Sequence, residues 1–217
     1  MKGGIPLRNE PILLNEALLL GRGGHKDVYA DPTNFTRCIK ILHDENDLDW
    51  KRELRYRRSR ELRGLHSKML PAYYGPLETN LGRGYVFERI FDFDGTPSLS
   101  FDAALVRAIK ENRPMDELRQ MLEDGLLKLY WDMREEQLLI SNVEFQNFLI
   151  QRTARDVYRV RIVDNIGSPV AIPLMFYIGF LARAHIDRYW RRHVSLLRET
   201  YPDLITEDMK KRLLQFI

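Results

Sequence analysis

The sequence predicts an α+β fold in which an antiparallel sheet precedes a mostly helical half. Short apolar and β-branched runs, separated by Gly and Asp-Pro turn signals, dominate residues 12–91. Helical periodicity dominates residues 101–216, and the polar linker 92–97 is rich in turn formers. We therefore expect two lobes, residues 1–96 with the sheet and residues 97–217 with the helices.

The first half is expected to contain five strands and one helix. The strands are expected over 12–20, 26–29, 36–42, 73–79 and 84–91. Between the third and fourth strands, leucines recur at roughly helical spacing among many Arg and Glu residues, which predicts a helix over 47–66. Pro71 is expected to end this helix, because proline restricts the residue before it.

The second half is expected to contain four helices and one pair of short strands. The helices are expected over 101–112, 115–136, 174–201 and 207–216, and the strands over 148–151 and 159–163. Pro114 stands at the start of the second helix, where the missing N–H costs nothing. The two strands are close enough in sequence to form a hairpin.

Composition excludes several classes of protein. The chain has 217 residues with 44% apolar residues, enough for a packed core. A net charge of +3 is too small to indicate a nucleic-acid partner. Cys38 is the only cysteine and cannot form an internal disulfide, which favours a reducing compartment. Because there is no apolar leader and no run long enough to span a bilayer, we expect a cytoplasmic protein without membrane insertion.

The segment 21–26 has the composition of a phosphate-binding loop. Gly21, Gly23 and Gly24 allow the backbone to approach an anion closely and to point N–H groups at it. A plain glycine-rich β-turn is the commoner explanation of such a segment. The third glycine of the pattern G-x-G-x-x-G is replaced by Lys26.

Lys40 and Glu53 form a second candidate pair. Lys40 alternates with Ile39 and Ile41 along an apolar strand, and a lysine on the core-facing side of a sheet requires a partner. Glu53 in the following helix is the expected partner, and the pair would face a cleft. The alternatives are an exposed edge-strand lysine and a glutamate on a solvated helix face.

Asn147 and Asp164 are the strongest candidates for metal ligands. Asn147 precedes one expected strand of the hairpin and Asp164 follows the other, so both are expected at the same end. Mg²⁺ prefers oxygen ligands and uses one or two protein groups together with phosphate oxygens. The alternative is that both residues serve only as turn formers.

Taken together, these segments resemble a protein kinase whose general base is missing. A kinase catalytic loop has the pattern D-x-x-x-x-N, followed later by D-F-G. Asn147 and Asp164 match its last Asn and its metal-binding Asp, whereas Asn142 stands where the general-base Asp is expected. Glu144 lies within the same loop, where a kinase places a phosphate-contacting lysine.

The chain as a whole is similar to the YrbL family of PhoP regulatory network proteins, within the wider protein-kinase-like superfamily. The resemblance covers most of the chain. Among the segments that carry it are Gly21-Arg22-Gly23-Gly24-His25-Lys26, Arg37-Cys38-Ile39-Lys40-Ile41, Gln146-Asn147, Asp164-Asn165-Ile166-Gly167 and Arg188-Tyr189-Trp190-Arg191-Arg192. It implies a bilobal protein-kinase-like fold, with an antiparallel N-lobe sheet and a short helical C-lobe.

The resemblance also implies the cofactors ATP and Mg²⁺. Lys40 and Glu53 would take the positions of the phosphate-binding lysine and its helix partner, and residues 87–90 would form a hinge facing the adenine. Glu88 and Ile90 are the expected hinge contacts. The leading hypothesis is a nucleotide-binding, pseudokinase-like regulatory protein with an unidentified protein or small-molecule partner. The alternatives are an atypical kinase for a small molecule or sugar, and an adaptor that binds no nucleotide.

Overall fold

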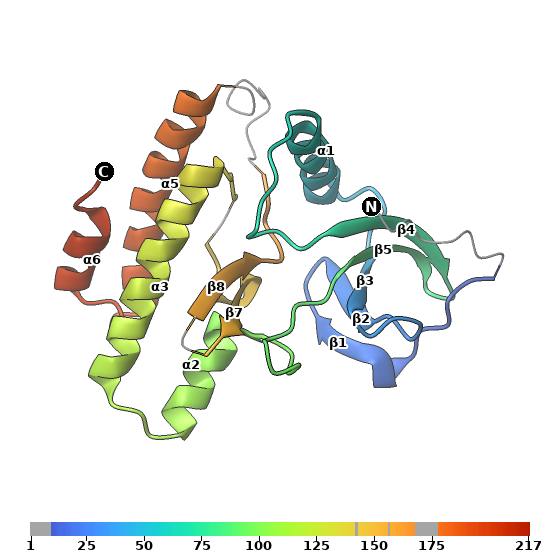
Figure 1. The fold of residues 1–217 in the computed structure, drawn as a ribbon, viewed down its shortest axis with the longest axis horizontal. Helices are drawn as coiled ribbons and strands as arrows, with labels where there is room; N and C mark the ends of the chain where they lie inside the picture. Colours follow the sequence, from blue (N-terminus) through green and yellow to red (C-terminus); the bar gives the residue numbers. More distant parts are fainter. Residues whose placement is uncertain (1–9, 142, 156, 168–177) are drawn as a thin grey trace.

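A computed structural model shows a mixed α+β architecture and describes residues 10–141, 143–155, 157–167 and 178–217. A five-stranded antiparallel sheet has the order β1-β2-β3-β5-β4 (Figure 1). Its strands are β1 Leu19–Arg22, β2 Lys26–Ala30, β3 Arg37–Leu42, β4 Tyr73–Thr79 and β5 Gly82–Glu88. This order places β3 at the centre of the sheet.

Helix α1 (Leu48–Leu62) follows β3 in sequence and is set by its caps. Asp47 Oδ1 accepts a hydrogen bond from Trp50 N at 2.8 Å and so satisfies one of the unpaired donors of the first turn. The helix ends before Gly64, which adopts a φ of +67°. The prediction that Pro71 ends the helix was therefore wrong, because a glycine terminates it earlier.

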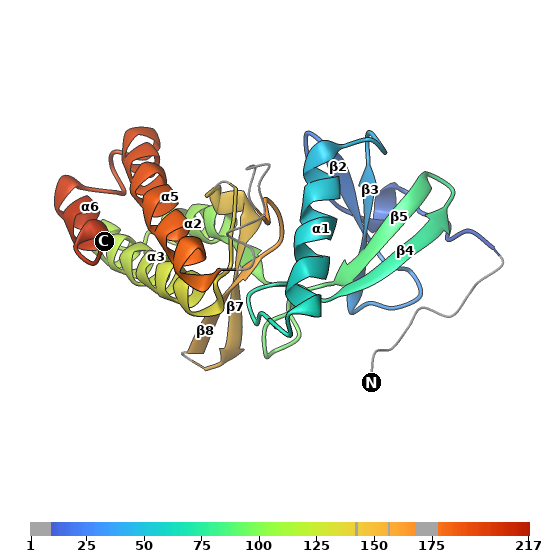
Figure 2. The same ribbon diagram turned by 90° about the horizontal axis from the view of Figure 1, so that it is seen from above.

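The second half combines helices with a small sheet. The three-stranded antiparallel sheet has the order β6-β7-β8, formed by Leu99–Ser100, Phe148–Ala154 and Val157–Ile162. The described helices are α2 (Phe101–Lys110), α3 (Met115–Glu136), α5 (Gly179–Thr200) and α6 (Glu207–Leu214). Figure 2 shows these four helices on one side of the molecule, the five-stranded sheet and α1 on the other, and β7 and β8 between them.

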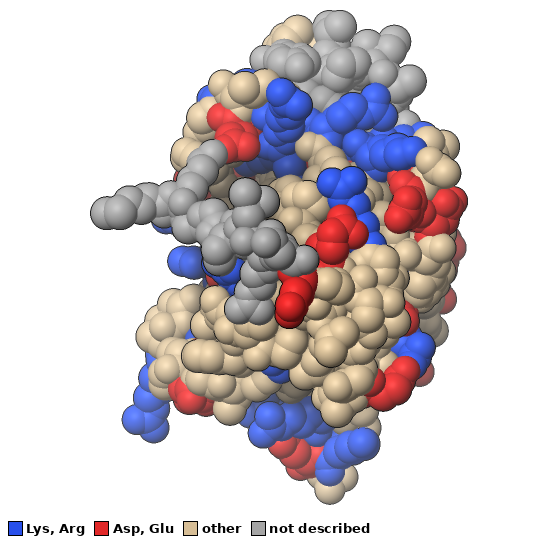
Figure 3. Space-filling model, turned by 90° about the vertical axis from the view of Figure 1, so that its right-hand side faces the viewer, with Lys and Arg blue, Asp and Glu red and all other residues tan. Residues whose placement is uncertain are grey.

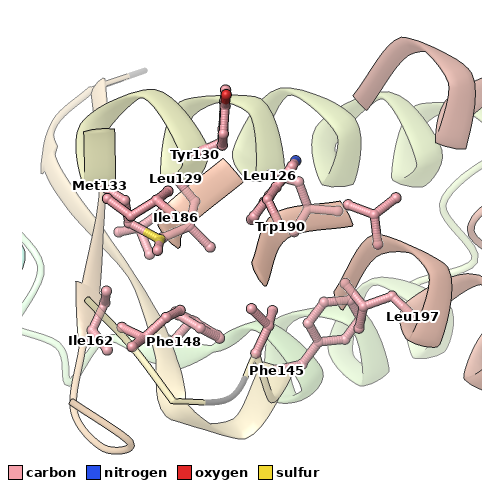
Figure 4. Packing of buried hydrophobic residues seen from close by; sticks show 14 of the residues in the cluster. Leu126, Leu129, Tyr130, Met133, Phe145, Phe148, Ile162, Ile186, Trp190 and Leu197 are labelled. Carbon is pink, nitrogen blue, oxygen red and sulfur yellow. The ribbon is translucent and has the colours of Figure 1, made fainter. Parts of the chain in front are cut away.

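The largest apolar core lies among the helices and the small sheet. Figure 4 shows α3 contributing Leu126 and Leu129, which lie opposite Phe148 and Ile162 from the hairpin, while Trp190 enters from α5. All five side chains are buried. Burying large apolar side chains from four elements in one cluster is the main force that holds this half together.

The five-stranded sheet has an apolar cluster on each face. Ile39 and Ile41 pack with Val86 on one face, as the alternation along β3 predicts. Cys38 packs with Trp50 of α1 and Phe87 on the other face. The sheet therefore has a face covered by α1, and the candidate site lies on that face.

Most of the element predictions were confirmed in type, with differences at several boundaries. Residues 73–79 and 115–136 form the expected strand and helix. The strand expected over 12–20 was wrong: Ile12 forms one isolated bridge, a 3₁₀ turn η1 follows over Glu16–Leu18, and β1 begins only at Leu19. The reason is local, because Asn15 Oδ1 caps that turn by accepting from Ala17 N at 3.0 Å.

The last long helix begins later than predicted. α5 begins at Gly179, and residues 168–177 lie outside the described residues. No helix in the described part of the chain is both long and apolar enough to cross a membrane. The α+β class and the antiparallel sheets are confirmed, while the kinase-like two-lobe arrangement and the division at residues 96 and 97 stay predictions.

The outer face of α1 is strongly basic. Lys51, Arg55 and Arg58 are exposed on successive turns of this helix. Figure 3 views the molecule from the side on which the five-stranded sheet lies. Lys and Arg side chains gather in the upper part of this view, at the height of α1 in Figure 1. Part of the positive charge on this face therefore comes from α1, and further Lys and Arg side chains lie along its lower edge (Figure 3).

Candidate functional site

A cleft of about 770 Å³ opens beneath the glycine-rich turn between β1 and β2. Its walls are the α1-covered face of the sheet, segment 87–90, and the residues around the start of β7 and the end of β8. The volume lies within the range of about 300–1,000 Å³ that is typical of small-molecule sites. The candidate residues from the sequence that are described, Gly21, Gly23, Gly24, Lys40, Glu53, Glu88, Ile90, Glu144, Asn147 and Asp164, all line this one cleft.

Lys40 lies on the central strand and faces the cleft. Its partner across β2 is Val28, which also lines the cleft, whereas Ile39 and Ile41 point to the opposite face. The Lys40 side chain is buried, and its Nζ donates to Val163 O at 2.6 Å. The alternative of an exposed edge-strand lysine is therefore wrong.

Burial is the main influence on the Lys40 ammonium group. It lowers the pKa of Lys40, and Lys26 lowers it further, while Glu53 and Asp164 act in the opposite direction. The Lys40 Nζ also lies 4.5 Å from the centroid of the Phe87 ring. Because burial disfavours the charged form of Lys40, an anion that binds next to its ammonium group would stabilise that charge.

Glu53 lies in the same cleft, but the predicted ion pair between Lys40 and Glu53 is wrong, because the Glu53 carboxylate binds Arg57 instead. Its Oε1 accepts from Arg57 Nε at 2.7 Å, and Arg57 NH1 also donates to Pro71 O at 3.1 Å. Arg57 is one helical turn away on the same face, so it reaches the carboxylate without any movement of the helix. Glu53 is buried, so the alternative of a solvated helix face is also wrong.

Asn147 and Asp164 lie at the same end of the β7–β8 hairpin. Asn147 belongs to the 3₁₀ turn η2 (Phe145–Asn147) that leads into β7, and Val163 N donates to Asn147 O at 3.0 Å. The Asn147 Nδ2 donates to Glu144 Oε2 at 3.1 Å, which leaves the Oδ1 atom as the free oxygen of that amide. An amide oxygen and a carboxylate at one end of a hairpin have the donor chemistry that Mg²⁺ requires.

The electrostatic surroundings keep Asp164 ionised. Burial opposes ionisation, but Lys40 and Lys26 outweigh it and hold the pKa of Asp164 below its ordinary value. Within the described part of the chain, no group of three or more His, Cys, Asp or Glu side chains could hold a metal. Asn147 and Asp164 would supply two oxygen ligands to a cation such as Mg²⁺, which takes one or two protein groups and completes its shell with phosphate and water.

Lys26 is the functional-site residue that sequence reasoning missed. Its Nζ lies 2.5 Å from Asp164 Oδ1, in an ion pair between residues 138 positions apart. The signal was present in the alternation of β2, because Lys26 and Val28 share one face of the strand. In the sequence, Lys26 was noted only because it replaces the third glycine of the pattern G-x-G-x-x-G.

The three glycines form an open turn over the cleft. Gly23 N donates to Lys26 O at 2.9 Å, and a Cβ atom on Gly23 would approach that oxygen to 3.1 Å. A Cβ atom on Gly21 or Gly24 would meet no atom within 4 Å. Gly23 is therefore needed for the turn itself, while Gly21 and Gly24 leave open space beside it.

Glu88 lines the cleft, and its side chain is held by residues outside the ligand space. Its Oε2 accepts from Arg161 at 2.6 Å and from Ala72 N at 3.0 Å. That Glu88 contacts a cofactor stays a prediction, to which its backbone groups are suited. Ile90 is buried and lines the same wall, as expected.

The degenerate base region is described only in part. Asn142 lies outside the described residues. Glu144 accepts from Gln146 Nε2 at 3.0 Å as well as from Asn147. The role of Glu144 that the contacts support is to orient the Asn147 amide.

Comparison with known proteins gives a consistent family assignment. Residues 12–198 match the family described as PhoP regulatory network protein YrbL. The chain is 32% identical over 192 residues to the uncharacterized protein YrbL of Escherichia coli strain K12, an alignment that covers 85% of this chain and 87% of the relative. The uncharacterized protein YrbL of Shigella flexneri gives the same identity and coverage.

Proposed function

The chain belongs to the YrbL family of PhoP regulatory network proteins, and we propose that it is a kinase-like regulatory protein whose cleft binds a nucleotide together with Mg²⁺. The family description supports a regulatory role. The proposal includes a bilobal kinase-like arrangement, with residues 1–96 and 97–217 on either side of the cleft, and a cytoplasmic location. Phosphotransfer is proposed to be weak or absent.

The observation that carries this proposal is the charge at the inner end of the cleft. Lys26 and Lys40 direct their ammonium groups at consecutive residues, Asp164 and Val163. Glu53 pairs with Arg57, which does not line the cleft, so the Lys26 and Lys40 ammonium groups are the cations that an anion entering this end would meet. Such a cluster favours an anionic ligand with several oxygens, and a phosphate chain is the best match.

Apolar side chains of the kind that a purine base packs against also line the cleft. Val28 and Leu149 line it from β2 and β7, Phe87 lines it from β5, and Ile90 lines it from the segment that follows β5. Backbone groups of segment 87–90 can supply the polar contacts that fix the orientation of a base. Asn147 and Asp164 would hold the Mg²⁺ ion, which would neutralise phosphate charge.

Weak phosphotransfer follows from the residues in the base region. Asn142 is neutral and cannot remove a proton, and the loss of a general base typically costs about 10²- to 10⁴-fold in rate. Glu144 is already bound to Gln146 and Asn147. The residues proposed to bind the nucleotide and the metal are therefore present, whereas the general base is replaced by Asn142.

Isothermal titration calorimetry with ATP and ADP, with and without Mg²⁺ or Mn²⁺, tests this proposal. We expect Kd values of about 1 µM to 1 mM, equivalent to about 4–8 kcal/mol. Lys40→Met should weaken binding of both nucleotides, and Asp164→Ala should weaken metal-dependent binding more than metal-free binding. Lys110→Met on the exposed face of α2 is the matched control and should bind like the parent.

Two results would contradict the proposal. Complete absence of nucleotide binding with either metal would leave the adaptor as the function. Robust ATP turnover by the unchanged protein, abolished by Glu144→Gln, would identify an atypical kinase with a relocated base.

A further inference from the structure

The Lys26–Asp164 ion pair is held in place by backbone structure on both sides of the cleft. On one side, Lys26 O accepts from Gly23 N, and Lys26 pairs with Leu42 of β3. On the other side, Asp164 follows β8, and its Oδ1 also accepts from Asn165 N at 2.9 Å. A lysine stem has several rotatable bonds, so a change of rotamer can move the ammonium group away from Asp164 without any change in the sheet.

The Lys26–Asp164 pair keeps partial contact with water. The Lys26 and Asp164 side chains remain 15% and 29% exposed, respectively. Contact with water reduces what an ion pair contributes to folding stability. The pair does, however, hold the Lys26 ammonium group against Asp164, the carboxylate that is the best candidate for binding a divalent cation.

We infer that Lys26 is a phosphate-binding residue whose ammonium group occupies the cation position at Asp164 until a divalent cation displaces it onto the phosphates of the bound nucleotide. This inference rests on the proposed nucleotide site and adds its regulation by metal. Lys26 competes with the divalent cation for Asp164. It also supplies positive charge to a nucleotide that enters without metal, so that binding depends less on metal than it would with a neutral residue at position 26.

The geometry gives Lys26 access to both positions. Lys26 and Lys40 lie on the same face of neighbouring strands, and both line the cleft beneath the glycine turn. Lys40 Nζ is already fixed on Val163 O, one residue before Asp164. An anion bound against Lys40 would therefore lie close to the Lys26 ammonium group as well.

Lys26→Met separates the two roles because methionine keeps the length of the side chain and removes the charge. We expect metal-free affinity for ADP to fall by about 10- to 100-fold, the effect of losing one charge-assisted hydrogen bond. Affinity for Mn²⁺ alone, followed by the electron paramagnetic resonance signal of free Mn²⁺, should rise by about three- to tenfold because one competing charge is removed. Lys26→Arg keeps the charge, so both its loss of metal-free ADP affinity and its gain in Mn²⁺ affinity should be smaller than those of Lys26→Met. Lys110→Met should behave like the parent.

The quantity that decides is the ratio of ADP affinities with and without Mn²⁺. This ratio should be larger in Lys26→Met than in the parent by at least about tenfold. A ratio within about twofold of the parent value, with nucleotide binding retained, would overturn the role of Lys26 and leave the proposed function standing. Failure of the parent to bind any nucleotide would refute the proposed function instead.

The Mn²⁺ titration still tests the competition when no nucleotide binds. Equal or undetectable Mn²⁺ binding in the parent and in Lys26→Met would overturn the inference. Asp164→Asn provides a second check, because the Lys26→Met change should have no further effect on Mn²⁺ binding in that background. Thermal unfolding of each variant shows that a lost signal does not come from a failure to fold.

Discussion

Arg161 is a buried cation whose removal should reduce the stability of the fold. It lies on β8, and its side chain is 7% exposed, compared with 32% for Glu88 on β5. Arg161 donates to Glu88 Oε2 at 2.6 Å, to Gln151 Oε1 at 3.0 Å and to Leu70 O at 3.2 Å. It thus ties the small sheet to the five-stranded sheet.

We expect Arg161→Met to reduce the free energy of unfolding by about 2–3 kcal/mol. Breaking a fully buried ion pair by removing one partner costs about 3–5 kcal/mol, because the other charge is left uncompensated. The Glu88 carboxylate keeps some contact with water and its bond from Ala72 N, so the lower value applies.

Urea unfolding at pH 7, followed by tryptophan fluorescence, measures this change. A double-mutant cycle with Glu88→Gln should give a coupling energy of about 1–2 kcal/mol between the two side chains. Arg159→Met on the same strand is the control and should cost less than about 0.5 kcal/mol. A cost for Arg161→Met no larger than that of the control would refute the reasoning, as would a coupling energy near zero.

Three further predictions concern stability elsewhere in the chain. Gly84→Ala should destabilise by about 1–3 kcal/mol in urea unfolding, because its Cβ atom would come 2.6 Å from Ile39 Cγ2; a neutral result would mean that the sheet can shift at this point. Tyr56→Phe should cost about 1–2 kcal/mol, since its hydroxyl accepts from Leu139 N at 2.8 Å in a buried position; a much smaller cost in the same assay would show that water replaces the hydroxyl. Burial lowers the pKa of His193 from 6.5 to about 4, so the unfolded chain binds the proton more readily and stability should fall as the pH drops from 6.5 towards 4. After allowance for partial solvent screening this loss is about 1–2 kcal/mol. Unfolding curves at pH 7 and pH 4.5 should show a larger loss in the parent than in His193→Phe, in which His185, whose pKa burial also lowers, still contributes.

Local sequence patterns were sufficient to predict most of the elements and most of the candidate residues that line the cleft. Alternation along β3 correctly placed Lys40 opposite Ile39 and Ile41. The positions of Asn147 before one strand and Asp164 after the next correctly indicated that both lie at one end of a hairpin.

The pairing of charged groups within the cleft could not be predicted in the same way. Glu53 has Arg57 on its own helix and Lys40 on a neighbouring strand, and only the distances in the folded chain decide between them. Lys26 and Asp164 are brought together by the approach of the two parts of the molecule, which no local pattern encodes. Spacing along the chain predicts which residues share a face, but the choice of partner depends on the tertiary structure.

The position of Tyr56 has a consequence for how the molecule unfolds. Tyr56 belongs to α1, which packs on the five-stranded sheet, yet it is only 2% exposed within the large core of the other half. Arg60, one turn later, donates to the carbonyl oxygens of Glu136 and Gln137 at the end of α3. Neither half can lose its structure without exposing apolar surface that the other half covers, so heat should unfold the protein in a single calorimetric transition whose van't Hoff and calorimetric enthalpies agree.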